Sequence, residues 1–350
     1  MSTTTNRIRR NASGRVVALT AVSAAALTLA GCAGTSSGGS DANSVSIAGF
    51  SVLQTANKQL IADFQKTSAG KGVTFKQSYG ASGDQARAVL GGLKADEAHL
   101  SLEPDMQKLV DGGVVDKSWA DGANKGILTQ SVVVIVVRKG NPKHITGWND
   151  LVKPGVKIVT PNPGSSGSAK WNILGAYGSQ IAQGKSPAEA TAYLKKLIAN
   201  TVALPSSGHD ATTTFQSGTG DVLLSYEDEA IEARQAGADF DYIVPAQTLL
   251  IQNPGALTTK ASSAAKKFLD FQLSTQGQTD YAEQGFRPLD PSIKVDVQGA
   301  NDPSNPFPAP AKLLTIDQDF GGWDAANTKY FDEDNGIVTK LLAAAGKSSS

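Results

Sequence analysis

The chain has 350 residues and carries 32 basic and 32 acidic side chains, so its formal net charge is zero. A nucleic-acid-binding protein would be expected to present a basic face, and the sequence has no run of Lys or Arg that could form one. Cys32 is the single cysteine, which excludes a disulfide within the chain and leaves stability to the hydrophobic core.

The first 31 residues have the pattern of a signal peptide, with four arginines and an apolar run over residues 16–30. This run is short for a transmembrane helix. The sequence "LAGC" at residues 29–32 resembles a bacterial lipobox, which implies cleavage before Cys32 and diacylation of its thiol. The alternative is an ordinary secretory peptide with an incidental cysteine. The remaining chain has 28 basic and 32 acidic side chains, and its polar residues 32–43 are expected to form a flexible tether.

Strands and helices are predicted in alternation from Ser44 onwards. Residues 44–50 and 72–80 are typical of strands, and each is followed by apolar residues at helical spacing. Ser82 stands where it would cap the second of these helices. Residues 131–142 are a nearly continuous β-branched run, as in a strand buried on both faces.

The rest of the chain continues this alternation. A strand is predicted over 155–163, helices around Trp171 and over 187–199, and a mostly helical region from residue 261 onwards. This order predicts an α/β fold with parallel or mixed sheets between helices. The length beyond the tether exceeds what one hydrophobic core usually holds, so two lobes are expected.

Three turns share one design, in which a strand ends, a Gly- and Ser-rich turn follows and a helix begins. They lie at residues 79–86, 163–171 and 206–214. The first turn of a helix leaves backbone N–H groups unpaired, and the helix dipole adds partial positive charge there. Each turn by itself is either a helix cap or an anion site. Because ligands gather at the carboxyl ends of parallel strands, three such turns together favour one anion site with uncharged donors.

The sequence lacks the enzyme motifs that such turns could otherwise belong to. Residues 164–168, "GSSGS", lack the last glycine of a nucleophile elbow, and Ala169 stands where a P-loop has glycine before its lysine. The three histidines have no metal-ligand or triad spacing. The acidic segment 226–233, "YEDEAIEA", is expected to form a solvated helix face. We therefore expect no enzyme activity, no catalytic residue, no metal and no cofactor.

Four longer segments resemble the periplasmic sulfate-binding proteins of sulfate and thiosulfate ABC transporters. They are residues 77–96, 136–178 with "RKGNPK" and "TPNPGSSG", 212–230, and 285–290. The resemblance extends from Ser44 to about Trp323. It implies a two-lobed type II periplasmic-binding-protein fold, in which each lobe is a mixed or parallel sheet flanked by helices. The family closes these lobes over one sulfate dianion in the cleft between them, using uncharged donors.

Carried over by position, the resemblance implies an anion-binding role for seven residues. Residues 166–168 fall on the family's Ser-Gly-Gly donors, Ser82 on its first-lobe serine, and His209 on a backbone donor. The residue type departs from the family at four positions: serine replaces aspartate at 51 and glycine at 168, tyrosine replaces tryptophan at 226, and position 209 is histidine. The implied anion-binding set is Ser51, Ser82, Ser166, Gly167, Ser168, His209 and Tyr226.

These departures leave the identity of the anion open. Phosphate carries a proton at neutral pH and benefits from a carboxylate acceptor, whereas sulfate needs donors only. The loss of the family's aspartate at Ser51 therefore does not favour phosphate. Sulfate is the expected ligand, and thiosulfate, molybdate or another oxyanion is the alternative.

The sequence thus predicts a lipid-anchored, monomeric solute-binding protein on the extracytoplasmic side of the cell membrane. It would capture sulfate by lobe closure and deliver it to ABC permease subunits. A surface scaffold lipoprotein that kept the fold without transport is the alternative from another class. The first lobe is expected over 44–128 and 247–345 and the second over 129–246, with hinges near 126–131 and 245–248.

Overall fold

The structure is a computed structural model that describes residues 42–347. The predicted signal peptide, Cys32 and most of the tether lie outside these residues. The strands are β1 (Ser44–Phe50), β2 (Thr74–Gly80), β3 (Glu97–His99), β4 (Ile127–Arg138), β5 (Ile158–Val159), β6 (Thr201–Ala203), β7 (Val222–Tyr226), β8 (Phe240–Ile243), β9 (Gln247–Leu257) and β10 (Lys312–Leu314). The predicted strand over 44–50 is confirmed, and the strand predicted over 131–142 begins earlier and ends at Arg138.

Helices alternate with these strands, as the sequence predicted. The α-helices are α1 (Leu53–Lys66), α2 (Ser82–Leu90), α3 (Glu103–Asp111), α4 (Gly167–Ala182), α5 (Pro187–Asn200), α6 (Gly208–Gln216), α7 (Glu227–Gln235), α8 (Ser263–Gln272), α9 (Thr275–Glu283), α10 (Ile316–Phe320), α11 (Trp323–Ala326) and α12 (Ile337–Ala344). A 3₁₀ turn, η1, covers Trp148–Val152, and a π-helical turn, η2, covers Asn327–Phe331. Among these described residues, none of the helices combines the length and the apolar character that spanning a membrane requires.

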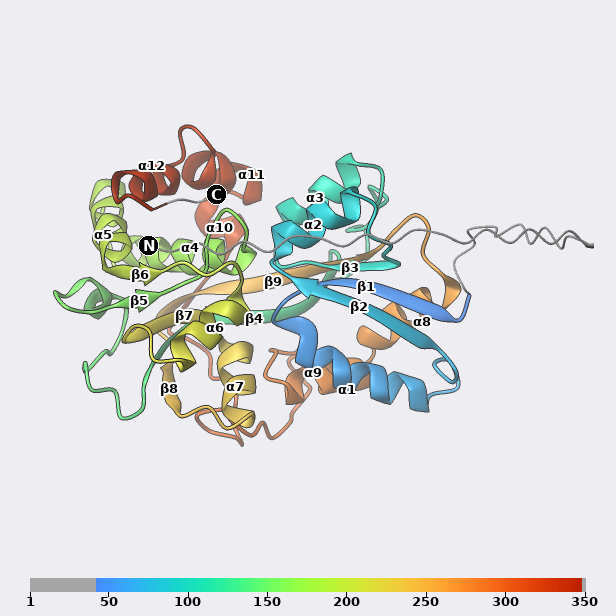
Figure 1. Ribbon diagram of the computed structural model, residues 1–350. Coiled ribbons are helices and arrows are strands. Elements are labelled where there is room, and N and C mark those ends of the chain that lie inside the picture. The colour runs from blue at the N-terminus through green and yellow to red at the C-terminus, as the bar shows by residue number, and fades with distance from the viewer. Residues whose placement is uncertain (1–41, 348–350) are drawn as a thin grey trace, which may run out of the picture. The chain divides into compact units, whose positions relative to one another are not determined.

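The strands pair in the order β2-β1-β3-β9-β4-β7-β5-β6, with β10 also on β9 and β8 also on β4 (Figure 1). β1 pairs in parallel with β2 and β3, and β5 pairs in parallel with β6 and β7. β4 and β9 run antiparallel to their neighbours β7 and β3. The sheet is therefore mixed, as expected.

β4 and β9 are long strands that connect two groups of shorter strands. Residues 127–132 of β4 pair with β9, whereas residues 133–138 pair with β7 and β8. Residues 255–257 of β9 pair with β3. We call β1, β2, β3 and the end of β9 the first sheet half, and β5 to β8 with the end of β4 the second sheet half.

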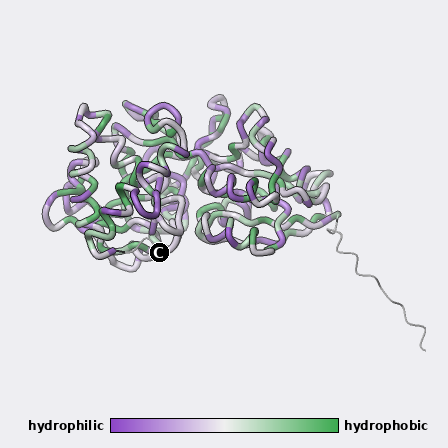
Figure 2. The backbone as a smooth tube through the Cα atoms, turned by 90° about the horizontal axis from the view of Figure 1, so that it is seen from above, coloured by the Kyte–Doolittle hydropathy of each residue, from purple (hydrophilic) through white to green (hydrophobic). Residues whose placement is uncertain are grey.

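Helices cover both faces of each sheet half. In Figure 1, α2 and α3 lie on one face of the first half and α1, α8 and α9 on the other. Along the chain, apolar and hydrophilic segments alternate at short intervals (Figure 2), as amphipathic elements require. On α1, the predicted apolar face packs into the core through Leu53, Leu60 and Phe64.

The core of the first sheet half contains two ionisable side chains whose pKa values shift in opposite directions. Glu97 in β3 is fully buried and accepts a hydrogen bond from the Gln272 amide at 2.8 Å. Burial raises the pKa of Glu97 to about 7. Burial also lowers the pKa of the neighbouring His99 to about 3, so that this imidazole stays neutral.

We predict that Glu97 lowers the stability of the protein as the pH rises from about 4.5 to about 7. Folded Glu97 keeps its proton up to a pKa of about 7, whereas the unfolded chain loses it near 4.5, so raising the pH favours unfolding. The loss from Glu97 should be about 3 kcal/mol over this range and should level off above about pH 7. His99 changes stability in the opposite direction, because the unfolded imidazole loses its proton near pH 6.5 whereas the folded imidazole is already neutral. This contribution is common to both variants below, so their comparison isolates Glu97. Urea unfolding of Glu97→Gln should show a smaller pH slope, and exposed Glu283→Gln should not. Equal slopes for both variants would contradict the burial of a protonated Glu97.

Candidate functional site

The three predicted Gly- and Ser-rich turns start helices α2, α4 and α6. Together with the segment that leads from β1 into α1, their first residues line one small pocket. Its lining residues are Phe50, Ser51, Val52, Ala81, Ser82, Ser101, Ser166, Gly167, Ser168 and Gly208. The structure therefore brings together five of the seven implied residues, and none of the lining side chains carries a charge.

The second sheet half contributes the start of α4. Ser166 is the N-cap residue, but its side chain makes no capping hydrogen bond, and Gly167 and Ser168 form the first helical turn. The α-helix itself supplies no acceptor for the N–H groups of this turn. Ser166 and Ser168 are almost fully buried, and the Ser168 hydroxyl has no hydrogen-bond partner. This turn therefore offers backbone and hydroxyl donors to the pocket.

Ser82 does not cap α2, so this sequence prediction is wrong. The N-cap is Ala81, and Ser82 is already the first residue of the helix, so its side chain does not act as the cap. Its hydroxyl donates to Asp105 Oδ2 at 2.7 Å and accepts from the Ser101 N–H at 3.0 Å. The hydroxyl of Ser82 is thereby occupied within the protein, and its backbone N–H is the group that remains for a ligand.

Ser101 is a lining residue that the sequence analysis missed. It follows β3 and precedes α3, which repeats the design of the three turns, but without glycine the pattern gave no signal. Its carbonyl oxygen accepts from Trp171 Nε1 at 2.9 Å and from Asn253 Nδ2 at 3.1 Å. Its hydroxyl lies 2.6 Å from the Tyr226 hydroxyl. Ser101 therefore joins α4, β7 and β9 at the pocket.

Two implied residues, Tyr226 and His209, lie next to the pocket without lining it. Tyr226 is fully buried at the end of β7 and reaches the pocket through the Ser101 hydroxyl. Burial raises the pKa of Tyr226 well above its ordinary value, so the phenol stays neutral. The side chain of His209 is exposed, its backbone N–H lies 3.5 Å from Ser51 Oγ, and the preceding Gly208 lines the pocket instead.

The acidic segment 226–233 is not a solvated helix face, so this prediction is also wrong. Glu227, Asp228 and Glu229 in the first turn of α7 are all buried. Arg287 forms a two-point ion pair with Glu227, with Nε 2.6 Å from Oε2. Arg287 is distant in the sequence, so helical spacing within the segment could not reveal this pairing.

The pocket is very small. Its volume is about 10 Å³, roughly the space that one water molecule needs. The absence of a side chain at Gly167 allows α4 to approach Ser101 and Leu102 closely, because a Cβ atom there would lie 2.5 Å from Ser101 Oγ and 2.7 Å from Leu102 Cγ. A tetrahedral oxyanion therefore requires the surrounding turns to move apart.

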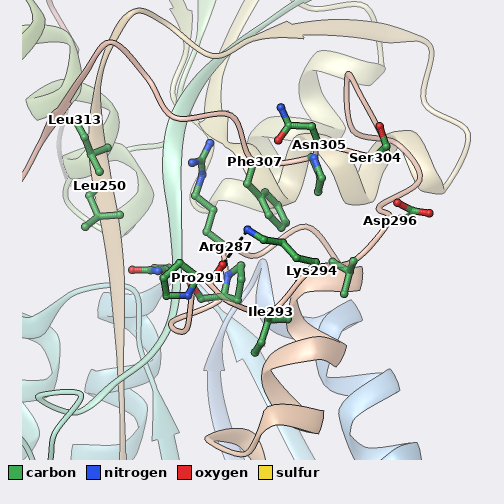
Figure 3. Close-up of a pocket in the computed structure, with 14 residues that line it drawn as sticks. Leu250, Arg287, Pro291, Ile293, Lys294, Asp296, Ser304, Asn305, Phe307 and Leu313 are labelled. Atoms are coloured by element: carbon green, nitrogen blue, oxygen red, sulfur yellow. Dashed lines mark hydrogen bonds between the residues drawn. The ribbon is translucent and has the colours of Figure 1, made fainter.

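A much larger cavity of about 560 Å³ lies away from these turns, between the segment around residues 287–307 and the strands β4 and β9. In Figure 3, Leu250 and Leu313 lie on one side of it and Phe307 lies across from them. None of the seven implied residues lines it. Arg287 within it is already neutralised by Glu227. We therefore place the candidate site at the small pocket.

We predict that Gly167→Ala destabilises the protein by about 1–3 kcal/mol, because the added methyl group overlaps Ser101 and Leu102. Gly122→Ala is the matched control, since a Cβ atom there meets nothing within 4 Å. Urea unfolding of both variants measures the difference. If they were equally stable, the close contact between Gly167 and Ser101 would not exist in solution.

Comparison with known proteins identifies relatives along most of the chain. The profile of bacterial extracellular solute-binding proteins matches residues 45–287. A sulfate-binding protein of Synechococcus elongatus is 38% identical over 93% of this chain and 95% of its own. A thiosulfate-binding protein of Pseudomonas aeruginosa is 32% identical over 84% of this chain and 90% of its own.

A solved structure agrees with this assignment. The sulfate-binding protein SubI from Mycobacterium tuberculosis superimposes with a TM-score of 0.77 at 41% identity, covering 83% of this chain and all of its own. A periplasmic thiamin-binding protein shares only the fold, with a TM-score of 0.61 at 17% identity. The predicted type II periplasmic-binding-protein fold is thereby confirmed. The chain belongs to the family of bacterial extracellular solute-binding proteins and is a relative of its sulfate- and thiosulfate-binding members.

Proposed function

We propose that this protein binds a doubly charged inorganic oxyanion, with sulfate as the first choice, and delivers it to the permease subunits of an ABC transporter. The observation that carries this proposal is the meeting of three helix N-termini and four buried serines at one pocket with uncharged lining. N–H groups and hydroxyls there can replace the water of a dianion with several charge-assisted hydrogen bonds. The names of the sulfate- and thiosulfate-binding relatives support the same ligand class.

The implied residues would donate hydrogen bonds to the anion from both sheet halves. Ser51 and the N–H of Ser82 would bind from the first half, and residues 166–168 from the second. The N–H groups of Gly208 and His209 would add donors from α6. Tyr226 would act through its contact with Ser101 rather than touch the anion itself.

Binding would be coupled to a movement of the two sheet halves. The small pocket volume supports this, because the turns have to part before an anion enters. The proposed hinges near 126–131 and 245–248 lie at the starts of β4 and β9, the strands that connect the halves. Lys125 and Gly126 have positive φ angles of 49° and 70°, so the chain turns sharply just before β4. We propose that residues 44–128 and 247–345 form the first lobe and residues 129–246 the second, as the sequence predicts.

We predict that isothermal titration detects one tight site for sulfate and weaker or no binding of phosphate. Thiosulfate and molybdate distinguish the alternative ligands, and absence of binding for all four anions would favour the scaffold alternative. Ser166→Asp should bind sulfate at least about tenfold more weakly than Ser166→Asn, because the two side chains have the same size and differ in charge. Equal affinities of the two variants would show that the anion binds elsewhere.

We further propose that Cys32 is diacylated and anchors the protein to the outer face of the cell membrane. The lipobox-like residues 29–32 support this, and the anchor would keep the protein close to its permease. We predict that mass spectrometry of the membrane-extracted protein finds a lipid-modified Cys32 at the mature N-terminus. Cys32→Ser should move the protein to the soluble fraction. A mature N-terminus at another residue, or an unmodified Cys32, would contradict the anchor.

A further inference from the structure

Another cavity, also of about 560 Å³ but distinct from the one in Figure 3, lies next to the small pocket. We call it the second cavity. Its walls come from α2 and α3, from α4 and the turn before it, and from the C-terminal segment around α12. The lining residues are Arg87, Lys108, Pro163, Gly164, Lys170, Phe331, Glu333, Val338, Thr339 and Leu342. Cavities of this size hold small molecules in many proteins.

The two cavities are close neighbours. Ser82 and Ser166 line the small pocket, whereas Arg87 and Gly164 line the second cavity. Between them, the Gly83 N–H donates to the Ser165 carbonyl oxygen at 3.2 Å. The small pocket and the second cavity therefore adjoin the same two segments, the start of α2 and the turn before α4.

Three cationic side chains meet at this cavity, and they differ in how their charge is compensated. Arg87 pairs with Asp84, and Lys108 pairs with Asp105 at 2.9 Å. Lys170 is half-buried and has no carboxylate partner in any ion pair of the described residues. The carboxylate of Glu333 also lines the cavity, but its side chain is exposed.

Lys170 is held in place by the C-terminal segment. Its Nζ donates to Asn327 Oδ1 at 3.0 Å and lies 5.0 Å from the centre of the Phe331 ring. Burial lowers the pKa of Lys170 to about 8; the charge of Asp105 acts in the opposite direction, and the charge of Lys108 lowers the pKa further. Asp105 is already paired with Lys108, so the partly buried ammonium group of Lys170 has no counter-ion of its own, and a bound anion would relieve this unfavourable burial.

Phe331, Val338 and Leu342 form an apolar wall of the cavity, and the Phe331 ring lies next to Lys170. The cavity therefore combines cationic side chains with apolar ones.

We propose that this cavity is a second anion-binding site, in which Lys170, Lys108 and Arg87 bind a sulfate or phosphate group. The group belongs either to the free oxyanion on its way to the small pocket or to a small phosphorylated molecule whose remainder contacts the apolar wall. This inference concerns residues other than those of the proposed function and does not require that function to be correct.

The reactivity of Lys170 provides a direct test in the intact protein. We expect acetylation by the N-hydroxysuccinimide ester of acetic acid at about pH 8 to modify Lys170, with peptide mass spectrometry as the readout. Sulfate, inorganic phosphate and glucose 6-phosphate are added in separate arms, at an ionic strength kept constant with chloride. We expect saturating anion to slow the acetylation of Lys170 at least about tenfold, while Lys266, which is 70% exposed, serves as the internal control. Protection by inorganic sulfate or phosphate indicates the free oxyanion, and protection by glucose 6-phosphate at much lower concentration indicates a phosphorylated molecule.

Two variants separate this site from the small pocket. In Ser166→Asp, protection of Lys170 should persist although tight sulfate binding is weakened, and in Lys170→Met a second, weaker binding event in calorimetry should disappear. Equal acetylation of Lys170 with and without every anion would overturn the second site. Loss of protection in Ser166→Asp would overturn it as well, because protection would then follow from closure at the small pocket. A chain that binds no sulfate at the small pocket can still show protection of Lys170, so the two proposals fail separately.

Discussion

The contacts of Ser101 are the interaction on which the arrangement of the candidate site depends. Its N–H donates to Ser82, its carbonyl oxygen accepts from Trp171 and Asn253, and its hydroxyl contacts Tyr226. Buried polar groups have to be paired, and pairing all of these groups at once fixes the first sheet half against α4 and β7. The close approach also requires glycine at 167, where any side chain would overlap Ser101.

Two carboxyl groups lie close to the pocket without lining it. Asp105 accepts from the Ser82 hydroxyl, and Glu229 accepts from the Ser225 hydroxyl at 2.9 Å. Burial raises the pKa of Glu229 to about 7, which reduces its negative charge next to the pocket. Hydroxyls and N–H groups thus separate these carboxyls from the place proposed for a dianion. The cation Lys170 lines the neighbouring cavity and not the small pocket, so its charge can attract an anion from beside the pocket.

Local patterns predicted the elements better than they predicted side-chain partners. The strand over 44–50, the apolar face of α1 and the helix starts after the three turns were predicted because each depends on nearby residues. The cap assigned to Ser82 was wrong because Asp105, on another helix, takes its hydroxyl. The solvated face assigned to residues 226–233 was wrong because Arg287 and the sheet bury its first turn.

The sequence by itself determined the α/β order of the fold, the seven positions that the family resemblance implies, and the absence of enzyme motifs, because these are properties of neighbouring residues and long matched segments. Only the tertiary structure decided which groups face the pocket. It placed Ser101 at the centre, Tyr226 behind it and Gly208 in front of His209. It also brought Lys170 together with Lys108 and Arg87. These contacts join residues far apart in the chain, and packing between helices and strands, rather than local spacing, sets such contacts.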